Sequence, residues 1–213
     1  MTALAQIVKA DLDAHDAALK SSKKNPALAA DPTPPPDGTL VMADFDGLAP
    51  TPVKWACPAG SWIGLSKSPG VTCAVSYNPN VRFGDRGNAL EITYKLLATP
   101  PAATGAWIRF RSDKEQAVNL TGYKFLSFVL RTPDAGRPTT TKVKVELRNA
   151  KGEIASVVAA PLNKNFTRFS IPFNKFTGIS DWSKVTEMYL VFDSATVTSK
   201  EGVVYLDNVA FSK

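Results

Sequence analysis

Acidic side chains interrupt the apolar pattern near both ends of the chain. The segment VVYLDNVAF (203–211) has the composition of a buried strand but contains Asp207, and MADFDG (42–47) contains Asp44 and Asp46. A buried carboxylate is costly unless it is hydrogen-bonded, paired with a cation or bound to a metal. If the first and last strands are neighbours, these acids converge on an oxygen-rich site of the kind that calcium prefers. The residues alone leave two interpretations open: a calcium site, or hydrogen bonding and ion pairing within the protein.

Signatures of enzyme catalysis are nearly absent. The sole histidine, His15, lies in the N-terminal segment, which excludes a histidine-dependent triad or a histidine-rich metal site in the rest of the chain. No GxSxG, P-loop or GxGxxG motif occurs. A pair of acids suffices for a glycosidase, and Glu91, Glu146 and Asp193 are the candidates for such a pair. None of them sits in a dense acidic motif, so the chain is predicted not to be an enzyme.

Two cysteines, Cys57 and Cys73, bracket a segment rich in Gly, Ser and Pro, CPAGSWIGLSKSPGVTC. A disulfide between them would restrict the unfolded chain and stabilise the fold by about 3 kcal/mol for a loop of this size. Two buried thiols are the alternative. We predict the disulfide, and with it an oxidising compartment.

Composition and charge point to a globular protein without a membrane span. Hydrophobic residues make up 44% of the chain and charged residues 21%, and the formal net charge is +6. No apolar run approaches the roughly 20 residues that a transmembrane helix needs. The basic residues are spread over many segments, which favours a solvated surface over a nucleic-acid partner. The N-terminal segment lacks a signal-peptide pattern, so the chain is either intracellular or a form without its leader; the predicted disulfide favours an extracellular or periplasmic location.

The hydrophobic period changes along the chain. Residues 2–22 have the spacing of an amphipathic helix, and DPTPPP (31–36) is typical of a stiff polyproline-type linker. We therefore predict an N-terminal helix and linker over residues 1–36 and one domain over 37–213. Nine apolar, mostly alternating runs separated by turn sequences predict the strands of an all-β, antiparallel sandwich: 40–45, 88–97, 106–112, 124–132, 141–149, 153–161, 167–173, 187–194 and 203–211.

The order of several motifs resembles that of the jelly-roll carbohydrate-binding modules of the galactose-binding-like superfamily, most closely family 11. The motifs are the opening DFDG, then GNALEITY, then TRFSIPFNKF and the closing YLDN, and the resemblance covers about residues 39–213. It implies a two-sheet antiparallel jelly-roll β-sandwich. It also implies a structural calcium ion (Ca2+), held here by Asp44, Asp46 and Asp207.

In such modules, aromatic rings stack on sugars and planar polar side chains hold the hydroxyl groups. Strand alternation places Trp107 and Arg109 on one face of their strand. The predicted ligand-binding residues are Trp107, Arg109, Arg148, Tyr189, Asp193 and Trp62. Family 11 clefts are lined by several tyrosines, whereas Phe192 stands near one such position here. That departure, with the basic charge, favours an acidic polysaccharide over a β-glucan.

The leading interpretation is therefore a secreted, non-catalytic β-sandwich that binds a polysaccharide and contains a structural calcium. The alternative is a structural or assembly protein, in which residues 1–36 dock on a neighbouring chain to form a homo-oligomer.

Overall fold

The computed structural model describes residues 38–45, 57–64, 70–85, 87–97, 101–110, 117–134 and 136–213. The predicted helix at 2–22, the linker at 31–36, the boundary after residue 36 and Asp46 lie outside these residues. They stay predictions.

Eleven strands and one short 3-10 helix form in the described part of the chain. They are β1 (Leu40–Ala43), β2 (Ala59–Ile63), β3 (Thr72–Asn78), β4 (Ala89–Lys95), β5 (Ala103–Arg109), β6 (Phe125–Arg131), β7 (Val143–Asn149), β8 (Ile154–Ala159), β9 (Thr167–Pro172), η1 (Phe173–Lys175), β10 (Val185–Asp193) and β11 (Glu201–Ser212). No helix in these residues is long and apolar enough to cross a membrane.

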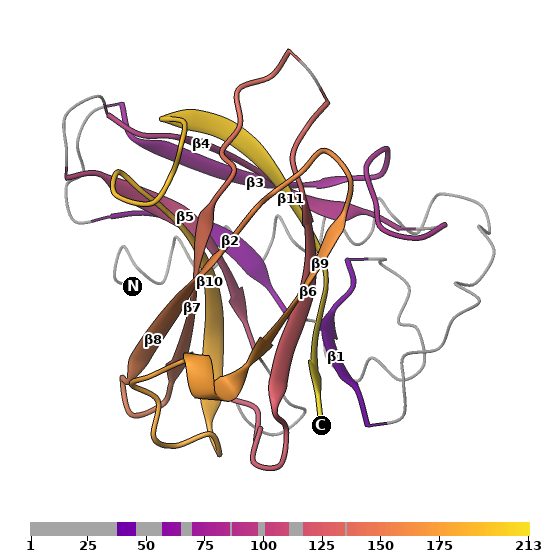
Figure 1. Cartoon of the computed structure of the whole chain (residues 1–213), viewed down its shortest axis with the longest axis vertical. Helices are drawn as coiled ribbons and strands as arrows, with labels where there is room; N and C mark the ends of the chain where they lie inside the picture. The colour runs from indigo at the N-terminus through magenta and orange to yellow at the C-terminus, as the bar shows by residue number, and fades with distance from the viewer. Residues whose placement is uncertain are drawn as a thin grey trace, which may run out of the picture.

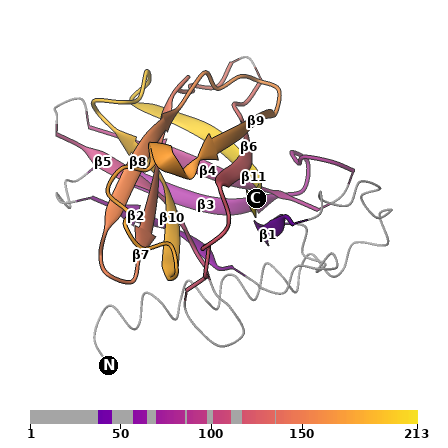
Figure 2. The same ribbon diagram turned by 60° about the horizontal axis from the view of Figure 1, so that its bottom comes forward.

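The strands form two antiparallel sheets that pack face to face (Figures 1 and 2). Sheet A has the order β3-β4-β11-β6-β9, with β1 also paired to β11, and sheet B has the order β2-β5-β10-β7-β8. On one edge of β11, β4 pairs with its first half and β1 with its second half, so the first and last strands are neighbours. This arrangement is the predicted two-sheet jelly-roll β-sandwich.

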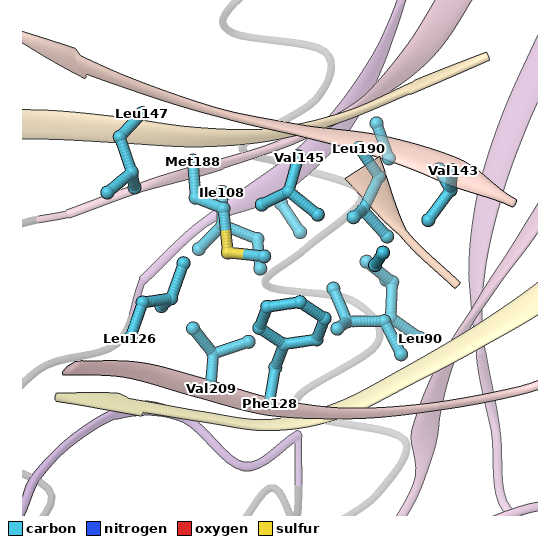
Figure 3. Close-up of a cluster of buried hydrophobic side chains, with 14 of the residues drawn as sticks. Leu90, Ile108, Leu126, Phe128, Val143, Val145, Leu147, Met188, Leu190 and Val209 are labelled. Atoms are coloured by element: carbon cyan, nitrogen blue, oxygen red, sulfur yellow. The ribbon is translucent and has the colours of Figure 1, made fainter. Parts of the chain in front are cut away.

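The core lies between the sheets because alternate residues of each strand point inward. Figure 3 shows Ile108, Val145 and Leu190 of sheet B directed toward Leu126 and Phe128 of sheet A, and all five are buried. Burying each such side chain contributes about 1.5–3 kcal/mol relative to leaving it in water. With their inward residues in the core, the strands of sheet B leave the intervening residues on its outer face.

All nine predicted strands are present, but β2 and β3 were missed. β2 lies within the segment between Cys57 and Cys73 and β3 begins at its end, and the Gly, Ser and Pro content of that segment indicated a loop without regular structure. β3 nevertheless has a strand signal, since Cys73, Val75 and Tyr77 alternate with small or polar residues and pack against the core.

Candidate functional site

The outer face of sheet B gathers most of the predicted ligand-binding residues. Antiparallel pairing aligns Trp107 of β5 with Tyr189 of β10 and Glu146 of β7. It also aligns Arg109 with Glu187 and Arg148 in the adjacent row. We call this surface the ion-pair face; its residues are Trp62, Trp107, Arg109, Lys144, Glu146, Arg148, Glu187, Tyr189 and Asp193.

Two ion pairs of this face connect arginines to carboxylates. Arg109 Nε lies 3.0 Å from Glu187 Oε1, and Arg148 Nη2 lies 3.3 Å from Glu146 Oε2. The Tyr189 hydroxyl donates a hydrogen bond of 2.8 Å to the second oxygen of Glu187. Each arginine side chain is about one third exposed, so these groups are reachable from solvent.

A third ion pair involves Lys144, whose Nζ lies 2.6 Å from Asp193 Oδ2 and 3.9 Å from Glu146 Oε1. Burial acts to raise the pKa of Asp193, but hydrogen bonds from Lys144 and Thr196 outweigh it and hold the pKa below its ordinary value. Three cations therefore face three carboxylates, and the ion-pair face is balanced in charge.

The aromatic rings of the face lie underneath these charged groups. Trp107 and Tyr189 are each only 9% exposed. The Arg109 guanidinium lies over the Trp107 ring at 4.4 Å from its centroid, and the Arg148 guanidinium lies over the Tyr189 ring at 4.0 Å. A ligand on this face would meet planar guanidinium groups first, whereas the sequence alone predicted direct stacking on Trp107.

Trp62 continues the aromatic floor on the edge strand β2. Its half-buried ring meets Tyr189 edge-on at 6.3 Å between centroids. Its indole Nε1 is buried without a hydrogen-bond partner, as is Nε of Arg148.

Burial raises the pKa of Tyr189 to about 12, helped by the hydrogen bond to Glu187, so this phenol stays neutral and donating at ordinary pH.

Phe192 is not a cleft residue, which corrects one sequence-based argument. It is completely buried and stacks on Tyr94 of sheet A at 4.0 Å between centroids. Because it points into the core, it cannot stand in for a ligand-binding tyrosine, and the sequence argument against a β-glucan retains only the basic charge of the chain.

The carboxylates considered for catalysis are distributed over both sheets. Glu146 and Asp193 share the ion-pair face, where Lys144 contacts both. Glu91 belongs to sheet A, accepts a hydrogen bond from Asn78 and pairs with Arg137. The three acids do not form one site.

Asp44 of the opening motif and Asp207 of the closing motif lie close to the pairing of β1 with β11. Ala43 is the Cα partner of Val209. Asp44 directly follows Ala43, and Asp207 lies two residues before Val209. Asp207 is 1% exposed, and its carboxylate accepts hydrogen bonds from Phe83 N at 2.9 Å and Asn208 N at 2.7 Å. The hydrogen-bonding alternative for this buried acid is therefore realised.

Further oxygen atoms are available at the same place. Asn88 donates to the Phe45 carbonyl oxygen at 3.1 Å, which connects the loop before β4 to the opening motif. Two carboxylates, a backbone carbonyl and a side-chain amide are hard oxygen donors of the type that calcium takes. Among the described residues no cluster of three His, Cys, Asp or Glu side chains forms here, and the calcium ion stays a prediction.

The predicted disulfide is not formed. Cys57 and Cys73 are both thiols: Cys57 is buried in the core, and Cys73 packs against the same cluster. Burial raises the pKa of Cys73 to about 12, so the thiol is neutral and unreactive. Both residues serve as small apolar core side chains, and the argument from a disulfide to an oxidising compartment no longer holds.

The fold is the two-sheet jelly roll that solved structures of carbohydrate-binding modules have. The family 11 module of the cellulosomal cellulase Lic26A-Cel5E of Clostridium thermocellum superposes with a TM-score of 0.58 at 15% identity, over 82% of this chain and 94% of that chain. A family 11 module from Clostridium thermocellum in complex with a β-1,3-1,4-mixed-linked tetrasaccharide gives 0.58 at 16% identity, over 82% and 95% of the two chains.

A family 30 carbohydrate-binding module superposes with a TM-score of 0.51 at 11% identity, over 73% of this chain and 91% of that chain. No protein-family model and no curated protein sequence matches this chain. At these identities the similarity establishes the fold, and it confirms at the level of fold the resemblance identified in the sequence.

Proposed function

We propose that the chain is a non-catalytic module that binds a neutral polysaccharide on the ion-pair face of sheet B. The observation that carries the proposal is the array of planar, partly exposed guanidinium groups paired with carboxylates above a floor of aromatic rings. Arg and carboxylate groups form directional, charge-assisted hydrogen bonds, which suits them to recognise sugar hydroxyls. The same fold holds a tetrasaccharide in a family 11 module.

The balance of charge on this face favours a neutral ligand over an acidic one. Lys144, Arg109 and Arg148 each have a carboxylate within 4 Å. An anionic ligand would have to compete with these carboxylates, whereas hydroxyl groups can donate to them and accept from the cations at the same time.

Substitution of Arg148 tests this function. Arg148→Gln removes the guanidinium over Tyr189, and we expect affinity for the polysaccharide to fall about tenfold, as when one charge-assisted hydrogen-bonding group is lost. Isothermal titration against soluble neutral polysaccharides, including β-1,3-1,4-mixed-linked glucan, measures the change. The matched control is Arg168→Gln, an arginine of sheet A that lies outside the ion-pair face. Failure of every neutral polymer to bind, or equal affinity of wild type and Arg148→Gln, overturns the proposal.

We also propose a structural calcium ion at the junction of β1 and β11, with Asp44, Asp46 and Asp207 as ligands. Support comes from the pairing of β1 with β11 and from the oxygen atoms near Asp207. A structural calcium would hold the two ends of the domain together without taking part in ligand binding.

A module of this function acts where polysaccharides are, so we propose an extracellular or periplasmic location. The alternative of assembly through residues 1–36 concerns a segment outside the described residues. Sedimentation velocity of the full chain distinguishes a monomer from a homo-oligomer.

A further inference from the structure

The outer face of sheet A, on the opposite side of the sandwich, contains a second set of interleaved arginines and aromatic rings. Its members come from the loop before β4, from β6, β9 and β11, and from the segments that precede β7 and β9. We call it the arginine–aromatic ladder, and it consists of Phe83, Arg131, Arg137, Phe166, Arg168 and Tyr205.

Each member of the ladder contacts the next. The Arg168 guanidinium lies 5.3 Å from the centroid of the Phe83 ring, and Phe83 meets Phe166 edge-on at 5.7 Å. Arg131 lies between two rings, at 5.7 Å from Phe166 and 5.8 Å from Tyr205. The series is a connected row of guanidinium groups and rings in which Phe83 and Phe166 are neighbours and Tyr205 is the buried member.

Buried groups of sheet A fix these positions. Tyr205 is the Cα partner of Arg131, and Asp207 is paired through Val129 to Arg168 in the next row. Asp207 accepts the hydrogen bond from Phe83 N, which holds the ring of Phe83 near Arg168. The carboxylate in the last strand therefore positions one end of the ladder.

The charge of the ladder is less neutralised than that of the ion-pair face. Arg168 is exposed, and none of the described residues supplies it with a carboxylate partner in an ion pair within 4 Å. Arg137 is about half exposed and lies 3.5 Å from Glu91. The partner of Arg131 is Asp134, whose side chain is 85% exposed and so gives only a screened interaction. Lys164, exposed two residues before Phe166, adds another positive charge.

We propose that the arginine–aromatic ladder binds the anionic groups of an acidic polysaccharide, at a site separate from the ion-pair face. A guanidinium fork matches a carboxylate or a sulfate group in a bidentate geometry. An arginine already resting on a ring loses less conformational freedom when it binds, and the flanking rings can pack against the apolar face of a sugar. The net charge of +6 attracts a polyanion at long range.

Arg168 is the residue to substitute, because it is exposed and its removal leaves no buried group unpaired. Three variants of the full chain are compared: Arg168→Gln, Arg168→Lys and, as a charge-matched control at exposed Lys175 of η1, Lys175→Gln. The probes are galacturonate oligosaccharides for a carboxylate ligand, dextran sulfate for a sulfate ligand, duplex DNA as a polyanion without sugar carboxylates or sulfates, and neutral dextran. All affinities are measured in the same calcium-containing buffer. The galacturonate oligosaccharides are short enough that calcium does not crosslink them into a gel.

We expect Arg168→Gln to weaken binding of one acidic probe about tenfold and Arg168→Lys to restore it only in part, because lysine keeps the charge but not the planar fork. The probe that responds identifies carboxylate or sulfate as the preferred group. Equal loss in Arg168→Gln and Lys175→Gln, tighter binding of duplex DNA than of either acidic polysaccharide, or no binding of the acidic probes overturns the proposal. Affinity for a neutral polysaccharide should respond to Arg148→Gln and not to Arg168→Gln, so the two sites fail or succeed independently.

Discussion

At the scale of single residues, two glycines determine how deeply the tryptophans of the ion-pair face lie. Gly60 of β2 is paired with Trp107 of β5, and a Cβ atom on Gly60 would overlap the indole ring. Gly105 is paired with Trp62, and a Cβ there would lie 2.8 Å from the indole Nε1. The absence of side chains at these positions lets each ring lie against the neighbouring strand, and Arg109 covers the ring of Trp107.

Gly60→Ala tests this dependence. The added methyl group forces the Trp107 ring out of its place, and overpacking of this kind costs about 1–3 kcal/mol of stability. Because Arg109 rests on that ring, we also expect weaker binding of the polysaccharide. Thermal unfolding and titration measure the two effects, with Ser61→Ala as the control on the adjacent position of β2. Unchanged stability and affinity in Gly60→Ala would show that the ring position does not depend on this glycine.

The depth of Trp107 could not be predicted from its own strand. Alternation placed Trp107 and Arg109 on one face of their strand and turned Arg148, Tyr189 and Asp193 outward on theirs, but it could not assign these faces to one sheet surface. The burial of the ring depends on which residue the neighbouring strand puts opposite it. That register depends on contacts between distant segments, which a single sequence does not display.

At the scale of elements, the turns explain which strands could be predicted. NAKGE gave a hairpin between β7 and β8, and the structure contains it, with Gly152 at a positive φ of 80°. β2 and β3 were missed because their small and polar residues resemble those of a loop. They are strands because β5 and β4 pair with them along their whole length, so tertiary pairing outweighs their weak local preference.

The β7–β8 hairpin also contains a set of hydrogen bonds to a carboxylate whose contribution to stability depends on pH. Glu153 accepts hydrogen bonds from Ser180 Oγ, Ser180 N and Asn149 Nδ2, which connects the hairpin to the segment before β10. These bonds, that from the Ser180 hydroxyl first, lower the pKa of Glu153 from 4.5 to about 2. Since the folded pKa is depressed, the stabilisation is present above pH 4.5 and is lost as the pH falls toward 2.

Glu153→Gln should remove this part of the pH dependence. We expect the variant to have a lower thermal midpoint than the wild type at neutral pH. The difference should shrink between pH 4.5 and about 2, because only the wild type loses the interaction in that window. Asp181 has a lowered pKa as well, but it is common to both proteins and cancels in the comparison. A difference in thermal midpoint between the two proteins that does not change with pH would contradict this role of Glu153.

At the scale of the whole molecule, β11 connects the two ends of the domain. It pairs with β6 on one side and with β4 and β1 on the other, so it forms the centre of sheet A. Asp207 lies at the bulge where β11 passes from β4 to β1, next to Asn208 with its positive φ of 51°. A carboxylate at this point can hold the loop that carries Phe83, and through the proposed calcium it can also hold the opening motif.

Asp207→Asn separates these two contributions. The amide keeps one acceptor oxygen but can turn its NH2 group toward Phe83 N, so the buried N–H group loses its partner at a cost of about 1–3 kcal/mol. Urea denaturation measures this loss, with Asp85→Asn as the control because Asp85 is an exposed acid of the same loop.

If calcium is bound here, removing it with a chelator lowers the thermal midpoint of the wild type, and readded calcium, but not magnesium, restores it. Asp207→Asn should respond much less to either treatment. A wild-type midpoint that is indifferent to the chelator, together with a destabilised variant, would mean that Asp207 joins the ends of the domain through hydrogen bonds alone.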